Sequence, residues 1–321
     1  MDFTLNFTKE NIKILQITDM QVIDSSQQRY EGRLCHAEYL KWLPDTKEKN
    51  LYRYIRELVF RTQPDMIIIT GDITYGEFDD SGRSLEEFIA FMDSFEIPWA
   101  PVYGNHDNET YIGVEKQNGV YENSKYCLFK KGECFGNGNY SIAIKNKDEL
   151  LRVICMMDSN GCGKLNIPQG FRKDQLEWLK KTSHDCDVPM FCCFHIPTAD
   201  FEKAYLAAGY QQGHDTSGEW EKYELSKDVV AKNGDFGKKD EPFYDFADGI
   251  MDTLKESRVD GVFAGHYHKI NLSVAHEGIR FTMGLKTGLY DYHDKEAMGG
   301  TLITISGKGF SVKHEYCKIE E

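Results

Sequence analysis

The sequence lacks the positive charge of a protein that binds long nucleic acids. It holds 38 Lys and Arg residues against 52 Asp and Glu residues, which gives a formal net charge of −14 over 321 residues. A protein that covers a long phosphate backbone needs clustered cations to neutralise it. We therefore expect no long nucleic acid as a partner.

The chain also has no long apolar run. None approaches the ~18 to 20 residues of a membrane-spanning helix, and residues 1–13 mix Asp, Lys and Glu where an export signal needs an apolar stretch. We expect a soluble, cytoplasmic protein that does not bind membranes.

Cysteine pairs and proline are scarce too. The nine cysteines form no Cys-x-x-Cys pair, and only 8 prolines are present. These counts argue against a disulfide framework, a cysteine zinc site and a Pro-rich disordered chain. With 40% hydrophobic residues, the chain should bury a sizeable core and keep its thiols reduced and mostly buried.

Six short apolar runs each end at a polar residue. Continuous runs without alternation are typical of strands that are covered on both faces. They are Ile12–Thr18, Met66–Thr70, Trp99–Tyr103, Leu151–Met157, Met190–Phe194 and Gly261–Gly265.

Helical patterns separate several of these runs. Apolar residues recur with helical spacing over 51–59, and a second helix should begin at Ser84, with Glu87 in capping-box spacing, and reach Phe95. Weaker patterns lie at 174–181 and 246–255.

The alternation of strand and helix patterns predicts an α/β fold with sheets in the middle, helices outside and functional groups at the carboxyl ends of the strands. Residues 279–312 should form short strands in an antiparallel part of a sheet.

Two long segments, 110–139 and 198–243, interrupt the pattern. Connections in such folds usually have about 2 to 6 residues. Because the second begins just after His195, we expect a lid over the site; the alternative is a surface insertion without a catalytic part. We expect one domain over 1–321.

The polar strand ends share one chemistry. All are oxygen or imidazole-nitrogen donors, none is a thiol, and the fold would bring them together. Such a set suits one or two divalent ions such as Mn, Fe, Zn or Co, whereas magnesium alone would not need three histidines. The donors are Asp19, Asp72, Asn105, His195, His266 and His268.

The order of these motifs resembles the calcineurin-like metallophosphoesterases. The motifs are Asp19 at a strand end, Gly71-Asp72, Gly104-Asn105-His106-Asp107, His195 and Gly265-His266-Tyr267-His268. The sequence of residues 97–100, Ile-Pro-Trp-Ala, is most similar to the purple acid phosphatase-related intracellular branch of this family. The resemblance runs from about residue 12 to 292. It implies an α/β/β/α sandwich with two central mixed sheets flanked by helices.

The resemblance also implies roles. Asp72 would bridge two metal ions, with Asp19 and His268 completing one site and Asn105, His195 and His266 the other. His106 would not be a ligand but a catalytic residue, which stabilises the phosphoryl group or protonates the leaving oxygen and is oriented by Asp107 or another carboxylate. The ions would be divalent or mixed-valence Mn, Fe or Zn, and would supply the attacking hydroxide.

One motif departs from the family pattern. Most members have Asp-x-His where this chain has Asp19-Met20-Gln21. Three interpretations remain open: Gln21 ligates through its amide oxygen; Tyr75 ligates as a tyrosinate on Fe(III), its alternative being a packing role; or the first site is weak.

Further residues are candidates for the substrate pocket or for supporting positions. Lys286, Tyr290, Tyr292 and His293 could hold a phosphate or stack on a base, or belong to an ordinary loop. Asp158 could orient His195 or His106, or cap a turn.

The expected function is hydrolysis of a small phosphorylated substrate. A phosphomonoester is the first choice and a phosphodiester such as a cyclic nucleotide the second. The competing class is a non-catalytic protein that binds a phosphorylated ligand, which the missing imidazole at Gln21 supports. The absence of a Gly-x-Ser-x-Gly elbow leaves a serine hydrolase without support.

Overall fold

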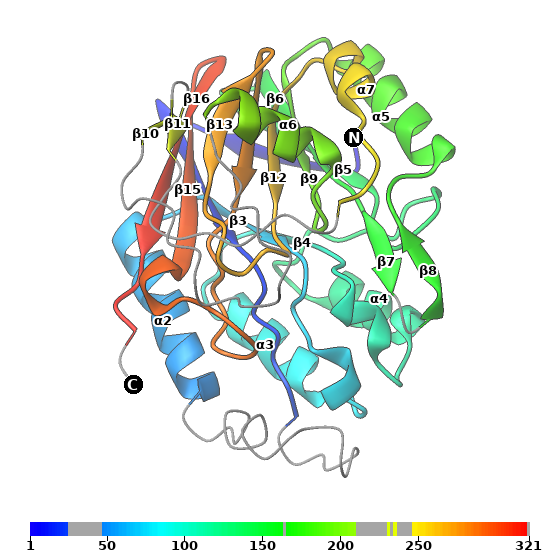
Figure 1. Cartoon of the computed structure of the whole chain (residues 1–321), viewed down its shortest axis with the longest axis vertical. Helices are drawn as coiled ribbons and strands as arrows, with labels where there is room; N and C mark the ends of the chain where they lie inside the picture. The colour runs from blue at the N-terminus through cyan, green and yellow to red at the C-terminus, as the bar shows by residue number, and fades with distance from the viewer. Residues whose placement is uncertain (25–46, 163–164, 210–229, 232–233, 236–245, 320–321) are drawn as a thin grey trace.

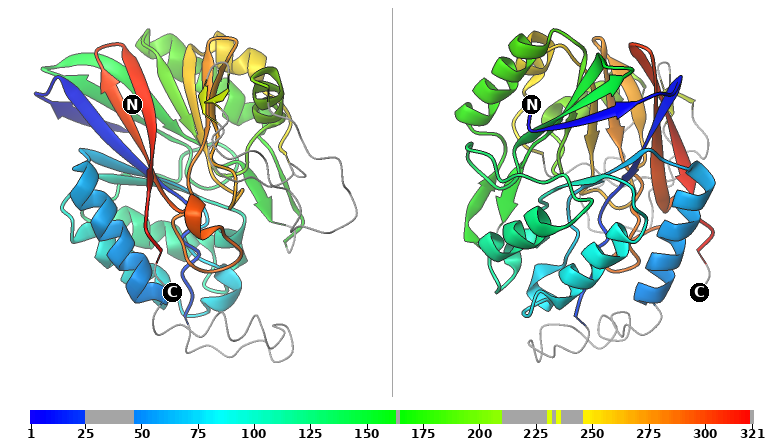
Figure 2. Two further views of the ribbon diagram at one scale, coloured as in Figure 1. Left: turned by 60° about the vertical axis from the view of Figure 1, so that its left-hand side comes forward. Right: turned by 180° about the vertical axis from the view of Figure 1, so that it is seen from behind.

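Two β-sheets lie together in the middle of the protein, with helices on both outer sides. The computed structural model describes residues 1–24, 47–162, 165–209, 230–231, 234–235 and 246–319. Figure 1 and the two views of Figure 2 show helices grouped at opposite sides of the strands.

The smaller of the two sheets is mixed. Strands β2, β3 and β4 run parallel, whereas β15 pairs antiparallel with β2 and with β16. The order is β16 (Gly309–Tyr316), β15 (Gly299–Ser306), β2 (Asn11–Ile17), β3 (Met66–Thr70) and β4 (Trp99–Val102).

The larger sheet is mixed as well. The order is β1 (Phe3–Phe7), β5 (Tyr140–Asn146), β6 (Glu149–Met156), β9 (Met190–Cys193), β12 (Val259–Ala264), β14 (Ile279–Met283), β13 (Ser273–His276), β11 (Gly234–Asp235) and β10 (Val230–Ala231). The four central strands from β6 to β14 are parallel, and antiparallel pairs follow them on both sides. The edge strand β1 is parallel to β5. A separate two-stranded sheet pairs β7 (Asn160–Cys162) with β8 (Ile167–Gln169).

The helices form the outer layers. Those beside the five-stranded sheet are α2 (Lys47–Thr62), α3 (Arg83–Asp93) and α4 (Val114–Asn123); those beside the nine-stranded sheet are α5 (Lys173–Cys186), α6 (Ala199–Ala207) and α7 (Met251–Glu256). Short 3-10 turns are η1 (Gly76–Phe78), η2 (His106–Glu109) and η5 (Lys295–Ala297). The predicted α/β/β/α sandwich with two mixed sheets is confirmed.

The apolar patterns explain the layers. One buried cluster joins the inner faces of both sheets, where the rings of Phe191 in β9 and Phe310 in β16 lie 4.7 Å apart. A second fills the space between the larger sheet and its helices. Each predicted run forms a strand whose bounds differ by two residues or fewer, because a continuous apolar run can be satisfied only between two covering layers.

Two helix starts differ from prediction. The capping box at Ser84 is wrong: α3 begins at Arg83 after Gly82, and the Ser84 hydroxyl donates to Asp79 Oδ2 at 2.7 Å. The helix expected over 246–255 begins only at Met251, because residue 247 pairs in an extended bridge with Thr198.

The predicted lid lies mostly outside the described residues. Within 198–243 the structure describes α6, β10 and β11, so the lid stays a prediction. The eight cysteines in the described part are free thiols, and six of them are buried. None of the helices described is both long and apolar enough to cross a membrane.

Candidate metal centre

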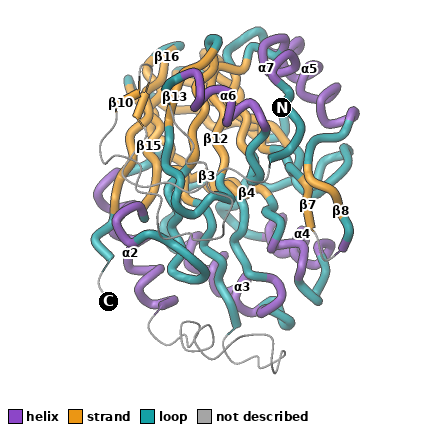
Figure 3. Tube along the Cα trace, viewed as in Figure 1, coloured by secondary structure: helices purple, strands orange, loops and turns teal. Residues whose placement is uncertain are grey.

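The six predicted donors come together where the carboxyl ends of five strands meet. Asp19 follows β2, Asp72 follows β3, Asn105 follows β4, His195 follows β9, and His266 and His268 follow β12. Figure 3 shows the loops beyond β3, β4 and β12 in the middle of the molecule. The Gln16 amide of β2 ties the sheets together here by donating to the carbonyl of Ala264 in β12 at 3.0 Å.

The first group of donors is Asp19, Asp72 and His268. One ligand atom of each lies within 4.8 Å of the others, and all three side chains are buried. His268 Nε2 is 3.3 Å from Asp19 Oδ1. Two carboxylates and one imidazole at this spacing could hold a divalent cation.

The second group surrounds Asn105. Its Oδ1 lies 3.2 Å from His195 Nε2 and 3.1 Å from His266 Nδ1. His195 Nε2 is also 3.3 Å from Asp72 Oδ2. Asp72 therefore borders both groups, as a carboxylate shared by two cations would.

The tautomers of the histidines support a cation in each group. His195 Nδ1 is 2.8 Å from the Thr70 carbonyl, and His268 Nδ1 is 2.9 Å from the Tyr292 carbonyl. A carbonyl only accepts, so Nδ1 of each ring carries a proton. Nε2 of His268 then offers its lone pair to the site, and Nε2 of His195 does so once that ring has lost its second proton. Asp19 Oδ1, which faces Nε2 of His268, accepts no hydrogen bond from the described residues. Two atoms that both offer a lone pair, such as His268 Nε2 and Asp19 Oδ1, would face each other in this way if a metal ion lay between them.

The charges of the site agree with this arrangement. Burial opposes a charge on His195, but the neighbouring Asp72 carboxylate raises the pKa of the ring to about 9. Burial likewise opposes ionisation of Asp72, whose pKa the His195 and His106 rings nevertheless lower well below its usual range. The site thus attracts positive charge, whether from a proton or from a metal ion.

The backbone is strained at the same positions. Asp19, Gln21, Asp72 and His266 have φ values of 54°, 50°, 49° and 76°. Residues other than glycine seldom adopt this left-handed conformation, and such strain concentrates at functional sites. A Cβ at Gly104 would lie 2.1 Å from Asp72 Oδ1, so only glycine lets the loop after β4 approach the carboxylate.

His106 lies beside the ligand groups and is oriented by a carboxylate. Its backbone N–H donates to Asp72 Oδ1 at 2.9 Å, and its Nδ1 lies 2.8 Å from Glu109 Oε2. Burial disfavours a charged ring, but Asp72 and Glu109 raise the pKa of His106 above its ordinary value. Sequence reasoning did not identify Glu109; an acidic residue three positions after His106 is the signal that could have found it.

The prediction named Asp107 or another carboxylate as the group that orients His106, and the contacts match the second alternative, Glu109. Both Asp107 oxygens accept backbone N–H groups instead, from Thr74 and Gly104, each at 2.8 Å. Burial and the nearby Asp72 raise the pKa of Asp107 to about 7. Asp107 therefore holds the loops after β3 and β4 together.

Gln21 and Lys286 contact each other behind the first group. Lys286 Nζ donates to Gln21 Oε1 at 2.6 Å and to the Asp19 carbonyl at 3.1 Å. Lys286 is buried, and its role in holding a phosphate stays a prediction. The Gln21 oxygen is directed at the lysine rather than at the ligand group.

The tyrosines lie on the two flanks of the centre. The Tyr75 ring stacks on His106 at 4.0 Å and packs against the buried cluster that contains Phe78 and Tyr290. These contacts match the packing alternative for Tyr75; its role as an iron ligand stays a prediction. Tyr292, 38% exposed, stacks on His268 at 4.2 Å, and its carbonyl fixes that ring.

Two remaining candidates have local partners. Asp158 accepts the backbone N–H groups of Asn137 and Asn160, both at 2.7 Å, so it caps turns, and burial raises its pKa to about 6. His293 Nδ1 lies 3.0 Å from the Asp291 carbonyl.

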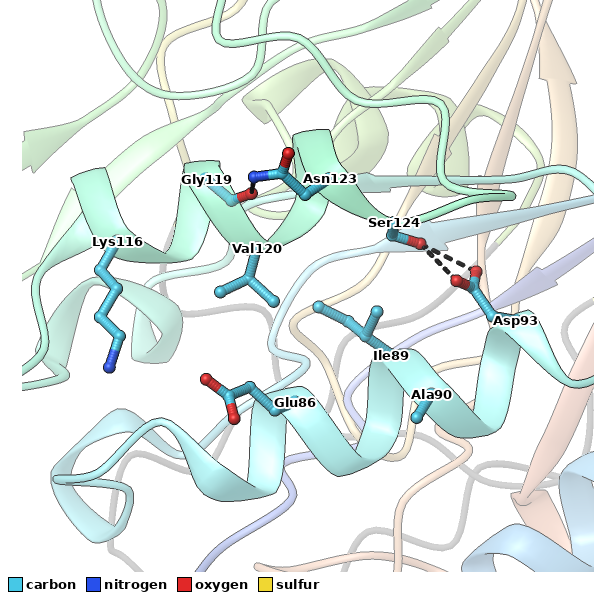
Figure 4. Close-up of a pocket in the computed structure, with 9 residues that line it drawn as sticks. All are labelled: Glu86, Ile89, Ala90, Asp93, Lys116, Gly119, Val120, Asn123 and Ser124. Carbon is cyan, nitrogen blue, oxygen red and sulfur yellow. Dashed lines mark hydrogen bonds between the residues drawn. The ribbon is translucent and has the colours of Figure 1, made fainter.

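A groove elsewhere on the protein has a different character. Figure 4 shows side chains of α3 and α4 around a hollow of about 630 Å³, with Ile89 and Val120 facing each other. None of the candidate donors lines it, so it is separate from the metal centre.

A two-sheet sandwich with carboxylate, amide and imidazole donors at its strand ends is the arrangement of a metallophosphoesterase. The chain matches the calcineurin-like phosphoesterase family over residues 12–270. Because this match covers most of the sequence, the protein belongs to that family, and the resemblance seen in the motifs is confirmed.

The curated relatives include a protein named as a phosphatase and proteins named as probable inactive purple acid phosphatases. The chain is 28% identical over 232 residues to probable inactive purple acid phosphatase 28 of Arabidopsis thaliana, covering 60% of this chain and 55% of that protein. It is 25% identical over 236 residues to phosphatase DCR2 of Saccharomyces cerevisiae, covering 63% of this chain and 39% of that protein. The chain thus spans about two fifths to about half of the length of these relatives.

Solved structures share the fold. A dimetal phosphatase from Danio rerio aligns with a TM-score of 0.50 at 13% identity, over 94% of this chain and 98% of that one. A purple acid phosphatase from yellow lupin (Lupinus luteus) seeds aligns with a TM-score of 0.50 at 13% identity, over 96% of this chain and 52% of that one.

Proposed function

We propose that the protein hydrolyses a small phosphomonoester at a dinuclear metal centre. The observation that carries this proposal is the convergence of two ligand groups on one shared carboxylate, Asp72, with His106 next to it. Asp19 and His268 would complete one site, and Asn105, His195 and His266 the other.

The bound ions would neutralise the phosphoryl oxygens and lower the pKa of a coordinated water towards ~7. The protein's own groups supply the rest. His106, kept protonated by Glu109 and Asp72, would donate a proton to the leaving oxygen. Asp107 holds the two loops in register, and the carbonyls of Thr70 and Tyr292 fix the tautomers of the ligand histidines.

A second candidate is a non-catalytic protein that binds a phosphorylated ligand. Gln21 in place of the usual histidine favours it, as do relatives whose names call them inactive. Retention of His106 together with its carboxylate partner favours the enzyme, because a binding protein has no need of a positioned proton donor.

The test compares variants of the full chain after loading with Mn²⁺. We expect hydrolysis of p-nitrophenyl phosphate to exceed that of bis-p-nitrophenyl phosphate. His106→Ala should keep its metal and lose about 10² to 10⁴-fold in kcat, whereas Asp72→Asn should lose metal and activity together. His276→Ala, which changes a histidine of β13 outside the centre, is the matched control.

The outcomes separate the candidates. A metal-loaded parent without turnover on either compound favours the binding protein. Faster hydrolysis of the diester favours a phosphodiesterase. Unchanged activity in both the His106 and the Asp72 variants contradicts the proposed centre.

A further inference from the structure

Lys286 is a buried cation at the edge of the first ligand group. It follows β14, its side chain is 1% exposed, and its Nζ donates to Gln21 Oε1 at 2.6 Å and to the Asp19 carbonyl at 3.1 Å. These two hydrogen bonds are directed at the segment that carries the unusual Asp19-Met20-Gln21 motif.

The backbone holds Lys286 in this place. Thr18 and Lys286 pair in a parallel bridge, and Thr287 N–H donates to the Thr18 carbonyl at 2.9 Å. On the other side, the Lys286 carbonyl accepts the Gly299 N–H at 3.0 Å. The lysine is therefore built into the contact between β2 and the start of β15, and its ammonium group has little freedom to turn elsewhere.

The contact fixes the orientation of the Gln21 amide. A lysine ammonium can only donate, so it must face the amide oxygen. The amide nitrogen then faces the ligand group, where it lies 3.5 Å from both Asp72 Oδ2 and His268 Nε2. An amide nitrogen is a hydrogen-bond donor and offers no lone pair to a cation.

We propose that Lys286, acting through Gln21, makes the two metal sites unequal, so that the Asp19–His268 site binds its ion more weakly than the Asn105–His195–His266 site. The inference rests on the proposed metal centre and adds a specific inequality to it. The weaker site has an amide N–H₂ group at its border and a buried positive charge behind it, which repels a cation. The stronger site has the Asn105 carbonyl oxygen directed towards both of its histidines.

Titration calorimetry of the metal-depleted full chain with Mn²⁺ tests the inference. We expect two binding events whose dissociation constants differ about tenfold or more. Asn105→Ala should remove the tighter event and leave the weaker one, which assigns each event to its site.

Two variants test the part played by Lys286. Gln21→Glu keeps the size of the side chain and can accept from Lys286 with one oxygen while offering the other to the ion, so the weaker event should tighten about tenfold. Lys286→Met removes the charge and releases the amide, and should tighten the same event. Lys269→Met is the matched control: its Nζ lies 5.8 Å over the Tyr292 ring, close to the site, and this variant should bind as the parent does.

Circular dichroism of each variant checks folding. If Lys286→Met does not fold, Gln21→Glu still tests the inference. Equal affinities in the parent overturn the inference and leave the proposed function standing. The same holds if Gln21→Glu leaves the weaker event unchanged, or if Asn105→Ala removes the weaker event. A parent that binds no ion contradicts the inference and the metal centre together.

Discussion

His106 Nδ1 and Glu109 Oε2 lie 2.8 Å apart within the single turn η2. The carboxylate fixes the ring and favours its charged form, and the Tyr75 ring covers one face of the imidazole at 4.0 Å. A histidine held in this way beside Asp72, the carboxylate proposed to be shared by two metal ions, is suited to donate a proton.

This contact predicts a shift in the pH profile. Glu109→Gln removes the negative charge that stabilises the imidazolium, so the pKa of His106 should fall and the protonated acid should be lost at lower pH. We expect the alkaline limb of kcat to move down by about one pH unit and kcat to fall about tenfold, with metal content unchanged.

Glu115→Gln is the control for that variant, because Glu115 pairs with Lys131 outside the centre. An alkaline limb that stays in place in Glu109→Gln would show that the carboxylate does not act on His106.

The raised pKa of His195 leads us to expect that metal binding releases a proton. The metal-free ring has a pKa of about 9, raised by Asp72 against the effect of burial, so at pH 7 it is protonated and must lose that proton to become a ligand. We expect about one proton released per ion at the tighter site, and an affinity for Mn²⁺ that rises with pH up to about 9.

Calorimetry at pH 7 in two buffers of different ionisation enthalpy measures the release. His276→Ala should release the same number of protons as the parent. Binding heats that do not depend on the buffer would contradict a protonated His195.

The close packing around Gly104 leads us to expect that one added methyl group lowers both metal content and stability. In Gly104→Ala the new Cβ would meet Asp72 Oδ1 at 2.1 Å and the Asp72 backbone nitrogen at 2.3 Å. We expect the shared carboxylate to move, most of the metal to be lost, and the free energy of unfolding to fall by about 1 to 3 kcal/mol.

Metal analysis and urea unfolding check both parts of this prediction. Gly119→Ala in α4 is the matched control, since its Cβ would meet no atom within 4 Å and a helical alanine is favoured by about 0.5 to 1 kcal/mol. Full metal retention in Gly104→Ala would contradict the close approach of the two loops.

Several features of the centre were predicted from local patterns. The apolar runs identified β2, β3, β4, β9 and β12 because such runs need cover on both faces, and the polar residues after them gave the donor set. Parallel strands bring their carboxyl ends to one edge, so Asp19, Asp72 and Asn105 could be expected to meet before any coordinates were known.

The local pattern near His106 offers more than one partner for the ring and does not choose between them. Asp107 and Glu109 are both carboxylates near His106, and only the path of η2 decides that Glu109 reaches the ring while Asp107 accepts amides from two loops. The Ser84 capping box failed for a similar reason: the helix begins at Arg83, so Ser84 lies inside it and its hydroxyl donates to Asp79 in the preceding loop.

Hydrophobic periodicity and residue type act locally, so they were enough to predict the layers of this protein, the strand ends and the chemical type of each donor. Which atom faces which follows from packing between segments that lie far apart in the chain. Lys286 lies 265 positions from Gln21 in the chain, and their contact exists because β2 and the segment between β14 and β15 are held together by the sheets. The direction of the Gln21 amide, on which the proposed inequality of the two metal sites rests, depends on that long-range packing.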